Sequence, residues 1–190
     1  MTGRVIILNG VSSSGKTTLA RAIQEQAKYS VLHVEMDKFI SFIPNGDELK
    51  PDWFKVTKTD GLSPALPHIA NGPKGEKLLA AMRQFVVKTA QSGLDLVVDE
   101  VCHAAQIDQY RAGLERCTIC VVKVAASLEE LAMRERARGD RLIGLAREQS
   151  DHLHIGIDYD LEVRTDLDPT NVIAERILKL VDTAKKPRAG

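Results

Sequence analysis

The feature that most constrains the fold is an apolar run near the N-terminus that leads directly into a glycine- and serine-rich loop. Residues 5–9 read VIILN, and residues 10–17 read GVSSSGKT, which matches G-x-x-x-x-G-K-[ST] at every fixed position. A short continuous apolar run is typical of a strand that is buried on both faces. Apolar residues at helical spacing follow the loop, at Leu19, Ala22, Ile23 and Ala27. A strand, this loop and a helix in succession predict a phosphate-binding loop.

The fixed positions of the loop give it its expected chemistry. Gly10 and Gly15 permit backbone angles that a residue with a Cβ resists, so the loop can turn its N–H groups inward around phosphate oxygens. We expect Lys16 to reach the β- and γ-phosphates of ATP and the Thr17 hydroxyl to bind Mg²⁺. The expected nucleotide-binding residues of the loop are Gly10, Ser12, Ser13, Ser14, Gly15, Lys16, Thr17 and Thr18.

The rest of the chain alternates short apolar runs with stretches of helical period. Apolar runs predict strands over residues 31–36, 95–100, 119–124 and 161–164, in addition to residues 5–9. Strands that alternate with helices imply βαβ units and a parallel sheet. We therefore predict an α/β fold, a three-layer sandwich, in a single domain over residues 1–190.

Several of the predicted helices carry specific signals. Ser127 and Glu130 form an S-x-x-E capping box that opens one helix. The last helix is expected to have Asp168 as its N-cap and Pro169 at its first position. Its expected buried face is Ile173, Ile177, Leu180 and Val181. A long helix before residue 95 is expected to bury one face made of Leu78, Met82, Phe85 and Thr89.

Charge and composition exclude several classes of protein. The 190 residues hold 26 Lys plus Arg and 26 Asp plus Glu, and a net charge of zero argues against a dedicated nucleic-acid binder. A basic cluster at the C-terminus is interpreted as a solvated tail: Lys185, Lys186 and Arg188. The apolar run at the N-terminus is too short for a signal peptide, and no stretch reaches membrane length, so we expect a cytoplasmic protein. Cys117 and Cys120 lack a second ligand pair, which favours buried thiols over a zinc site.

The segment from residue 44 to residue 75 differs from the rest of the chain. It is rich in residues that interrupt regular structure: Pro44, Gly46, Pro51, Gly61, Pro64, Pro67, Gly72, Pro73 and Gly75. So long an irregular stretch inside a compact domain is usually a functional loop or lid. We predict an acceptor-site insertion over about residues 38–75.

Two acidic residues follow predicted strands. Asp99 ends the run LDLVV and is expected to bind Mg²⁺ together with Thr17; the alternatives are that Glu100 serves the metal, or that Asp99 caps the next helix. Asp37 follows the strand over residues 31–36. Because ligands gather at the carboxyl ends of parallel strands, Asp37 can orient an acceptor hydroxyl and take its proton. The alternative role for Asp37 is a cap for a helix that begins at Lys38.

A cluster of arginines follows the predicted strand over residues 119–124. Residues 133–141 read MRERARGDR, which places Arg134, Arg138 and Arg141 at spacings of four and three, with Gly139 expected to end the helix. Arginines folded over a phosphoryl group stabilise the charge that spreads over its oxygens during transfer. We therefore predict a lid over about residues 134–150 with Arg134 and Arg138 as catalytic residues. The alternative is a solvated helix end whose arginines pair with neighbouring acids: Glu129, Glu130, Glu135 and Asp140.

Together these features resemble the small-molecule kinases of the phosphate-binding-loop class, and in particular the chloramphenicol phosphotransferases. The matching pieces are IILNG-x-SS-x-GK (6–16), Asp37, VVDEV (97–101), RE-x-ARGDR (134–141) and H-x-G-x-x-YD-x-EV-x-T (154–165). The resemblance implies phosphorylation of a hydroxyl on chloramphenicol by ATP, a form of antibiotic resistance. It also implies that Asp37 is the base, that Arg134 and Arg138 belong to the lid, and that five parallel strands lie in the order 2-3-1-4-5.

The chain departs from that family in two places. The segment from residue 44 to residue 75 does not resemble it, so the acceptor stays open between chloramphenicol and another small metabolite such as a sugar acid or a nucleoside. Arg164 stands where we expect Asp, in a loop that borders the adenine in related kinases, and could stack on the base. A nucleotide-binding switch is the alternative from another class. His154 and Tyr159 lie in a matching piece without a derivable role, and His152 and His154 are interpreted as structural because no third metal ligand is evident.

Overall fold

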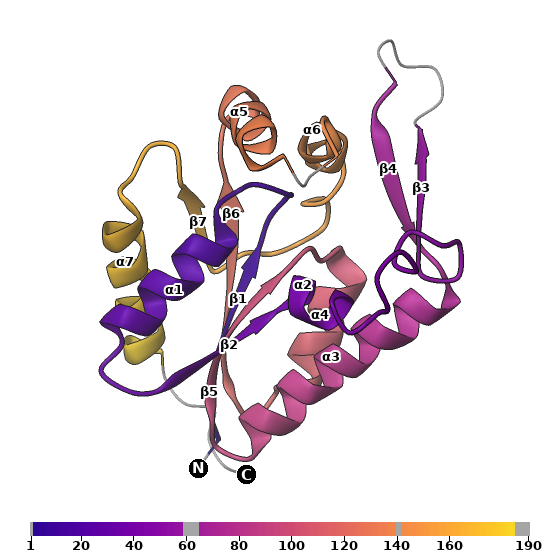
Figure 1. The fold of residues 1–190 in the computed structure, drawn as a ribbon. Helices are drawn as coiled ribbons and strands as arrows, with labels where there is room; N and C mark the ends of the chain where they lie inside the picture. The colour runs from indigo at the N-terminus through magenta and orange to yellow at the C-terminus, as the bar shows by residue number, and fades with distance from the viewer. Residues whose placement is uncertain (1, 59–64, 140–141, 185–190) are drawn as a thin grey trace.

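The apolar runs of the sequence form one parallel sheet at the centre of the molecule (Figure 1). The computed structural model describes residues 2–58, 65–139 and 142–184. The strands of this sheet are β1 (Arg4–Asn9), β2 (Val31–Glu35), β5 (Asp95–Glu100), β6 (Thr118–Ala125) and β7 (Leu161–Arg164). All of their pairings are parallel, in the order β2-β5-β1-β6-β7. Numbered along the chain within this sheet, that order is 2-3-1-4-5, as predicted.

Helices cover both faces of the sheet, which confirms the three-layer sandwich (Figure 1). Helices α1 (Lys16–Gln26) and α7 (Thr170–Thr183) lie on one face, and α3 (Pro73–Gln91) and α4 (Ala104–Gly113) lie on the other. Side chains alternate along each strand, so Ile6 and Leu8 of β1 pack toward α1 and α7 while Val5 and Ile7 pack toward α3 and α4. Two apolar cores thus fix the sheet from either side.

Two helices bury different faces from those predicted. In α3 the buried residues are Gly75, Leu79, Met82, Arg83, Val86 and Ala90, whereas Phe85 is 48% exposed. The prediction was wrong because a charged residue, Arg83, sits on the buried face and conceals its period. In α7 the buried residues are Ile173, Ala174, Ile177, Leu178 and Val181, whereas Leu180 is 36% exposed. This helix also begins one residue later than predicted, with Pro169 rather than Asp168 at the N-cap.

Helices α5 (Leu128–Arg138) and α6 (Leu145–Ser150) lie beyond the carboxyl end of the sheet (Figure 1). Only half of the predicted capping box forms at α5. The Ser127 hydroxyl accepts the Glu130 N–H, but the Glu130 carboxylate pairs with Arg134, and Asp166 takes the Ser127 N–H. The helix ends at Gly139, whose φ of 70° is left-handed, as predicted.

The segment over residues 44–75 was predicted to be irregular, and this prediction was wrong. It contains an antiparallel hairpin of β3 (Phe54–Lys58) and β4 (Pro67–Asn71), preceded by the short helix α2 (Met36–Ile40). The hairpin is anchored by an apolar cluster of Ile43, Phe54 and Leu79, and it projects past α6 (Figure 1). Gly61 and Pro64, and the basic tail residues Lys185, Lys186 and Arg188, lie outside the described residues.

Two further expectations can be compared with the described part of the chain. Cys102, Cys117 and Cys120 are free and buried, which confirms the interpretation of the C-x-x-C pair as thiols. Among the described residues, no helix combines the length and the apolar composition that crossing a bilayer requires.

One buried ion pair joins the sheet to both helices on its α3 side. Glu100 at the end of β5 is fully buried, and its Oε1 accepts from Arg83 Nε at 2.9 Å and lies 2.7 Å from Arg83 Nη2. Its Oε2 accepts from the Tyr110 hydroxyl of α4 at 2.6 Å. Removal of one partner of such a pair leaves an uncompensated charge in the core.

We predict that Arg83→Met lowers the free energy of unfolding by about 3–5 kcal/mol, because the Glu100 carboxylate is then buried without a cation. Tyr110→Phe should lower it by only about 1–2 kcal/mol. Urea denaturation followed by circular dichroism measures both. Arg136→Met on the exposed side of α5 is the control and should stay within about 0.5 kcal/mol. A loss below about 1 kcal/mol for Arg83→Met would contradict the role assigned to this pair.

Candidate active site

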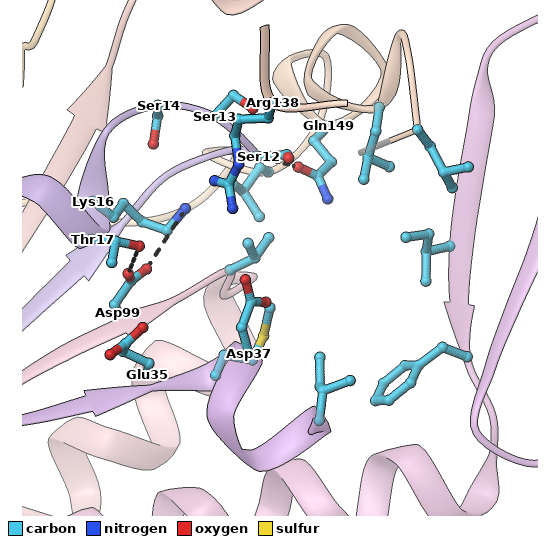
Figure 2. Close-up of a pocket in the computed structure, with 18 of the residues that line it drawn as sticks. Ser12, Ser13, Ser14, Lys16, Thr17, Glu35, Asp37, Asp99, Arg138 and Gln149 are labelled. Atoms are coloured by element: carbon cyan, nitrogen blue, oxygen red, sulfur yellow. Dashed lines mark hydrogen bonds and ion pairs between the residues drawn. The ribbon is translucent and has the colours of Figure 1, made fainter. Parts of the chain in front are cut away.

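The carboxyl ends of the strands open into a cavity of about 1350 Å³ (Figure 2). The phosphate-binding loop and α5 form one side of it, and α2 and the hairpin form the other. The end of β5 and helix α6 lie between the two sides. The cavity therefore brings together the predicted phosphate, metal and acceptor residues, which come from distant parts of the sequence.

Close packing and backbone conformation shape the phosphate-binding loop. Gly15 has a φ of 94° and Ser13 a φ of 60°, both in the left-handed region. We expected Gly10 to be a glycine because of its backbone angles, and that reason is wrong, because Gly10 is not among the residues with positive φ. A Cβ at Gly10 would instead lie 2.2 Å from the carbonyl oxygen of Val124 in β6. Glycine is required there because the loop passes so close to the neighbouring strand.

The serines of the loop have hydroxyl groups that are buried but unpaired. The Oγ atoms of Ser12, Ser13 and Ser14 have no hydrogen-bond partner among the described residues. Buried polar atoms are nearly always hydrogen-bonded, so three such atoms on one turn indicate a site arranged around a polar ligand. The Ser12 N–H donates to Oε1 of Gln149 in α6 at 2.7 Å, which links the loop to the predicted lid.

Lys16, Thr17 and Asp99 meet at the inner end of the loop (Figure 2). The Thr17 hydroxyl donates to Asp99 Oδ2 at 2.5 Å, and Lys16 Nζ lies 3.9 Å from Asp99 Oδ1. Lys16 Nζ also donates to the carbonyl oxygens of Gly10 and Val11, at 2.9 and 3.0 Å. A hydroxyl beside a carboxylate supplies the oxygen ligands that Mg²⁺ prefers, and a divalent ion fits the chemistry of this pair.

The structure separates the two candidate metal carboxylates. Asp99 and Glu100 are consecutive in β5, so their side chains point to opposite faces of the sheet. Glu100 is engaged by Arg83 and Tyr110 in the core, away from the loop. Asp99 does not cap the next helix either, because His103 is the N-cap of α4.

Glu35 is a further acidic residue that the sequence analysis missed. It precedes α2 as the N-cap residue, lines the cavity and points toward Asp99 (Figure 2). Its Oε1 lies 3.6 Å from Nδ1 of His33 on the same strand. Side chains along β2 alternate between the two faces of the sheet, and Glu35 lies on the same face as His33. This alternation was the sequence signal that could have identified Glu35.

Asp37 and Arg138 face the cavity from opposite sides (Figure 2). Asp37 lies in the first turn of α2, whose N-cap is Glu35, so Asp37 is not the cap of a helix beginning at Lys38. Arg138 is the last residue of α5, and its guanidinium reaches toward the phosphate-binding loop. A carboxylate and a cation are thus placed across a space bordered by the loop.

The other predicted arginines have different environments. Arg134 pairs with Glu130, donates to the Thr165 hydroxyl at 2.9 Å, and reaches the Ser13 carbonyl oxygen at 3.4 Å, so it ties α5 to the loop. Arg164 is not among the residues that line the cavity, and it forms two hydrogen bonds with Asp166, at 2.9 and 2.7 Å. Arg141 lies outside the described residues. Thr18 is exposed and borders the cavity.

His154 and Tyr159 support the end of β1. The Tyr159 hydroxyl lies 2.6 Å from His154 Nδ1 and accepts from Asn9 Nδ2 at 2.8 Å. Asn9 in turn exchanges two hydrogen bonds with the backbone of Cys102, at 2.9 and 2.8 Å. Burial lowers the pKa of His154 to about 4, so the ring is neutral at physiological pH and its Nδ1 accepts from Tyr159. These residues hold the strand from which the loop departs.

Comparisons with known proteins show what the chain is similar to in sequence and in fold. Residues 3–182 match the family model described as chloramphenicol phosphotransferase-like protein. A relative from Mycobacterium tuberculosis, named "Putative O-phosphotransferase Rv2636", is 29% identical over 98% of this chain and 86% of its own length. Among solved structures, a sugar kinase from Janibacter has a TM-score of 0.67 at 19% identity, over 98% of this chain and 97% of its own. The APS kinase of Mycobacterium tuberculosis has a TM-score of 0.66 at 15% identity, over 96% and 99%.

The unpaired hydroxyls lead to a prediction about stability without ligand. Ser14 is fully buried, and its Oγ has no partner among the described residues, so Ser14→Ala should remove a desolvation penalty and no hydrogen bond. We expect the free energy of unfolding of the ligand-free protein to stay constant or to rise by up to about 1 kcal/mol. Thr17→Val, which removes a bond to Asp99, should lower it by about 1–3 kcal/mol. Urea denaturation compares the two variants. A loss of unfolding free energy above about 1 kcal/mol for Ser14→Ala would show that the Ser14 hydroxyl does form a stabilising hydrogen bond, contrary to the structure.

Proposed function

The chain belongs to the chloramphenicol phosphotransferase-like family, and on that premise we propose that it transfers the γ-phosphoryl group of ATP, with Mg²⁺, to a hydroxyl group of a small molecule. The observation that carries the proposal is one cavity with a phosphate-binding loop on one side and the carboxylate of Asp37 on the other. A loop alone would suit any nucleotide-binding protein. The carboxylate across from it adds a group that can act on a second substrate.

The loop side of the cavity supports binding of ATP. The buried hydroxyls of Ser12, Ser13 and Ser14 lack partners among the described residues, and the start of α1 directs N–H groups toward the loop. Thr17 and Asp99 would hold Mg²⁺, which when bound offsets negative charge on the phosphate oxygens. Lys16, which bonds loop carbonyls in this structure, would exchange them for phosphate oxygens of ATP.

Residues from both sides of the cavity would carry the transfer. Asp37 would accept the proton of the acceptor hydroxyl as its oxygen forms a bond to the γ-phosphorus. The bond from the γ-phosphorus to the bridging oxygen breaks at the same time, and ADP leaves. Lys16 and Arg138 supply positive charge beside the loop, where negative charge spreads over the oxygens of the transferred group.

Two arginines take supporting roles in this proposal. Arg134 joins α5 to the loop through Ser13 and Thr165, and would hold the lid in register with the bound phosphates. Arg164 immediately precedes Thr165, whose hydroxyl lies 2.8 Å from the Ser14 carbonyl oxygen. We propose that the exposed guanidinium of Arg164 stacks on the adenine of ATP at the rim of the cavity, outside the residues that line it.

The acceptor side of the cavity is mixed in character. Its apolar lining comprises Ile40, Ile43, Phe54, Ile69 and Leu79. Polar side chains border the same region: Asn45, Glu48, Asn71 and Glu76. An acceptor with both an apolar body and hydroxyl groups fits this lining better than a small sugar acid. Chloramphenicol is the first candidate, and its phosphorylation would make this an antibiotic-resistance enzyme. A polyhydroxylated metabolite is the second candidate, on account of the polar residues.

We predict that Asp37→Asn lowers kcat by about 10²–10⁴, because the amide keeps the shape of the side chain but cannot take a proton. The Kd for ATP should change by less than about threefold, since Asp37 lies across the cavity from the loop. Coupled ADP release with the acceptor at saturation measures kcat, and calorimetry measures ATP binding.

Asp52→Asn is the matched control for this variant. Asp52 is exposed, lies outside the cavity lining and pairs with Lys74 on the surface. The kcat of the Asp52→Asn variant should therefore equal that of the wild type. If Asp37→Asn weakened ATP binding and left kcat unchanged, the acceptor would have been assigned to the wrong side of the cavity.

A further inference from the structure

A cluster of metal-binding side chains lies at the contact between the hairpin and α6. His68 in β4, and Glu148 and His152 in and just after α6, each offer one ligand atom, and these atoms lie within 4.8 Å of one another. His68 Nδ1 is 2.6 Å from Glu148 Oε1, and His152 Nε2 is 3.0 Å from the same oxygen. All three residues line the cavity. This cluster gives His152 two possible co-ligands that were not evident from the sequence, and it does not include His154.

We propose that His68, Glu148 and His152 bind one divalent transition-metal ion, such as Zn²⁺, which clips the hairpin to α6 at the wall of the cavity. The site is separate from the Mg²⁺ site proposed at Thr17 and Asp99. It involves no residue to which the transfer reaction has been assigned.

The geometry suits such an ion with small side-chain shifts. Tetrahedral ligands at about 2.0–2.1 Å from a zinc ion lie about 3.3 Å from one another. The two separations from Glu148 Oε1, 2.6 and 3.0 Å, are shorter than this, and the atoms of all three residues lie within 4.8 Å of one another. Each distance must therefore change by at most about 1.5 Å to admit the ion. In the structure, Oε1 of Glu148 bridges the two imidazole rings by hydrogen bonds.

The ligand set selects the class of metal. Two imidazoles and one carboxylate suit Zn²⁺ and similar borderline ions, whereas Mg²⁺ requires oxygen ligands in octahedral geometry. Three protein ligands leave one coordination position for water or for a group of a bound molecule, as in many zinc sites with an open position. A fourth imidazole is near, since the ring centroid of His103 is 5.4 Å from that of His152.

Burial and connectivity indicate that the cluster has more than a surface role. Glu148 is buried, with 7% of its surface exposed, and Nδ1 of His152 is a buried atom without a partner among the described residues. An ionised carboxylate in that position requires cations or donors around it, and a metal ion supplies such a cation. The partly exposed His68 and His152 side chains leave the ion a path from solvent.

A metal at this place would connect the two sides of the cavity. His68 belongs to the acceptor wall, while the neighbour of Glu148 in α6 is Gln149, which accepts the Ser12 N–H of the phosphate-binding loop. An ion held by His68 and Glu148 would therefore fix the hairpin relative to the loop. Metal binding and the order of the hairpin should accordingly be coupled.

Metal binding can be tested on the purified chain without any substrate. The protein is stripped with a chelator, dialysed into buffer with excess Mg²⁺, and titrated with Co²⁺ and with Zn²⁺. We expect one ion per chain, an intense visible absorption of Co²⁺ typical of four- or five-coordinate geometry, and displacement of Co²⁺ by Zn²⁺. His68→Ala and His152→Ala should each weaken binding by at least about tenfold. The melting temperature of the wild type should rise with Zn²⁺.

The control is His154→Gln, which removes a histidine two positions from His152 but outside the cluster, and should leave metal affinity unchanged. Circular dichroism verifies that each variant is folded, and the partial exposure of His68 and His152 favours tolerance of their replacement. Equal Zn²⁺ affinity in the wild type and in both cluster variants would overturn the proposal, as would the absence of stoichiometric binding by the folded wild type. Neither result would bear on the transfer reaction, because Asp37→Asn tests that separately.

Discussion

The parallel register of β1 against β5 is the constraint on which the site depends. Leu8 pairs with Asp99 and Asn9 with Glu100, so the strand that enters the phosphate-binding loop ends beside the strand that carries Asp99, the carboxylate proposed to bind Mg²⁺. Because both faces of the sheet are buried by helices, the carboxyl edge is where these strands can present polar groups to solvent. The alternation within β5 then sends Asp99 to the loop and Glu100 to the core, where Arg83 holds it.

The remaining walls of the cavity are built by elements that lie outside the central sheet. Helix α2 and the β3–β4 hairpin are held by a small apolar cluster on α3, while α5 and α6 are held to the loop by polar contacts. The buried Glu135 carboxylate caps the start of α6, accepting from Gly144 and Ala146 at 2.8 and 2.7 Å. The walls of the cavity are therefore held by contacts that lie outside the central sheet.

The sequence predicted the central sheet well, because strands buried on both faces are continuous apolar runs. The bounds of β5 and β7 agree with the predicted ones, and the order of the strands is the one that the family resemblance implied. The hairpin was missed because its strands are short, only partly buried and bordered by proline and glycine. The buried face of α3 was misassigned because Arg83 lies on it. A search for apolar residues at helical spacing does not identify a charged residue as buried.

The predicted site residues Lys16, Thr17, Asp37, Asp99 and Arg138 all line one cavity, which follows from motif spacing and from the rule that ligands gather at strand ends. Gln149 and the histidine cluster could not be found in the same way. They are single polar residues whose proximity depends on where α6 and the hairpin pack. Long-range packing of this kind leaves no local pattern in the sequence.

A mass-spectrometric acceptor screen determines whether the cavity brings ATP together with a small hydroxyl compound. The protein is incubated with ATP, Mg²⁺ and a panel of small alcohols that includes chloramphenicol, beside a parallel set with Lys16→Ala. We expect at least one compound to gain a phosphoryl group with the wild type and none with Lys16→Ala, because Lys16 is needed to hold the phosphates. Phosphorylation of the same compound at equal rates by both proteins would contradict this expectation, as would ATP hydrolysis that no compound in the panel accelerates.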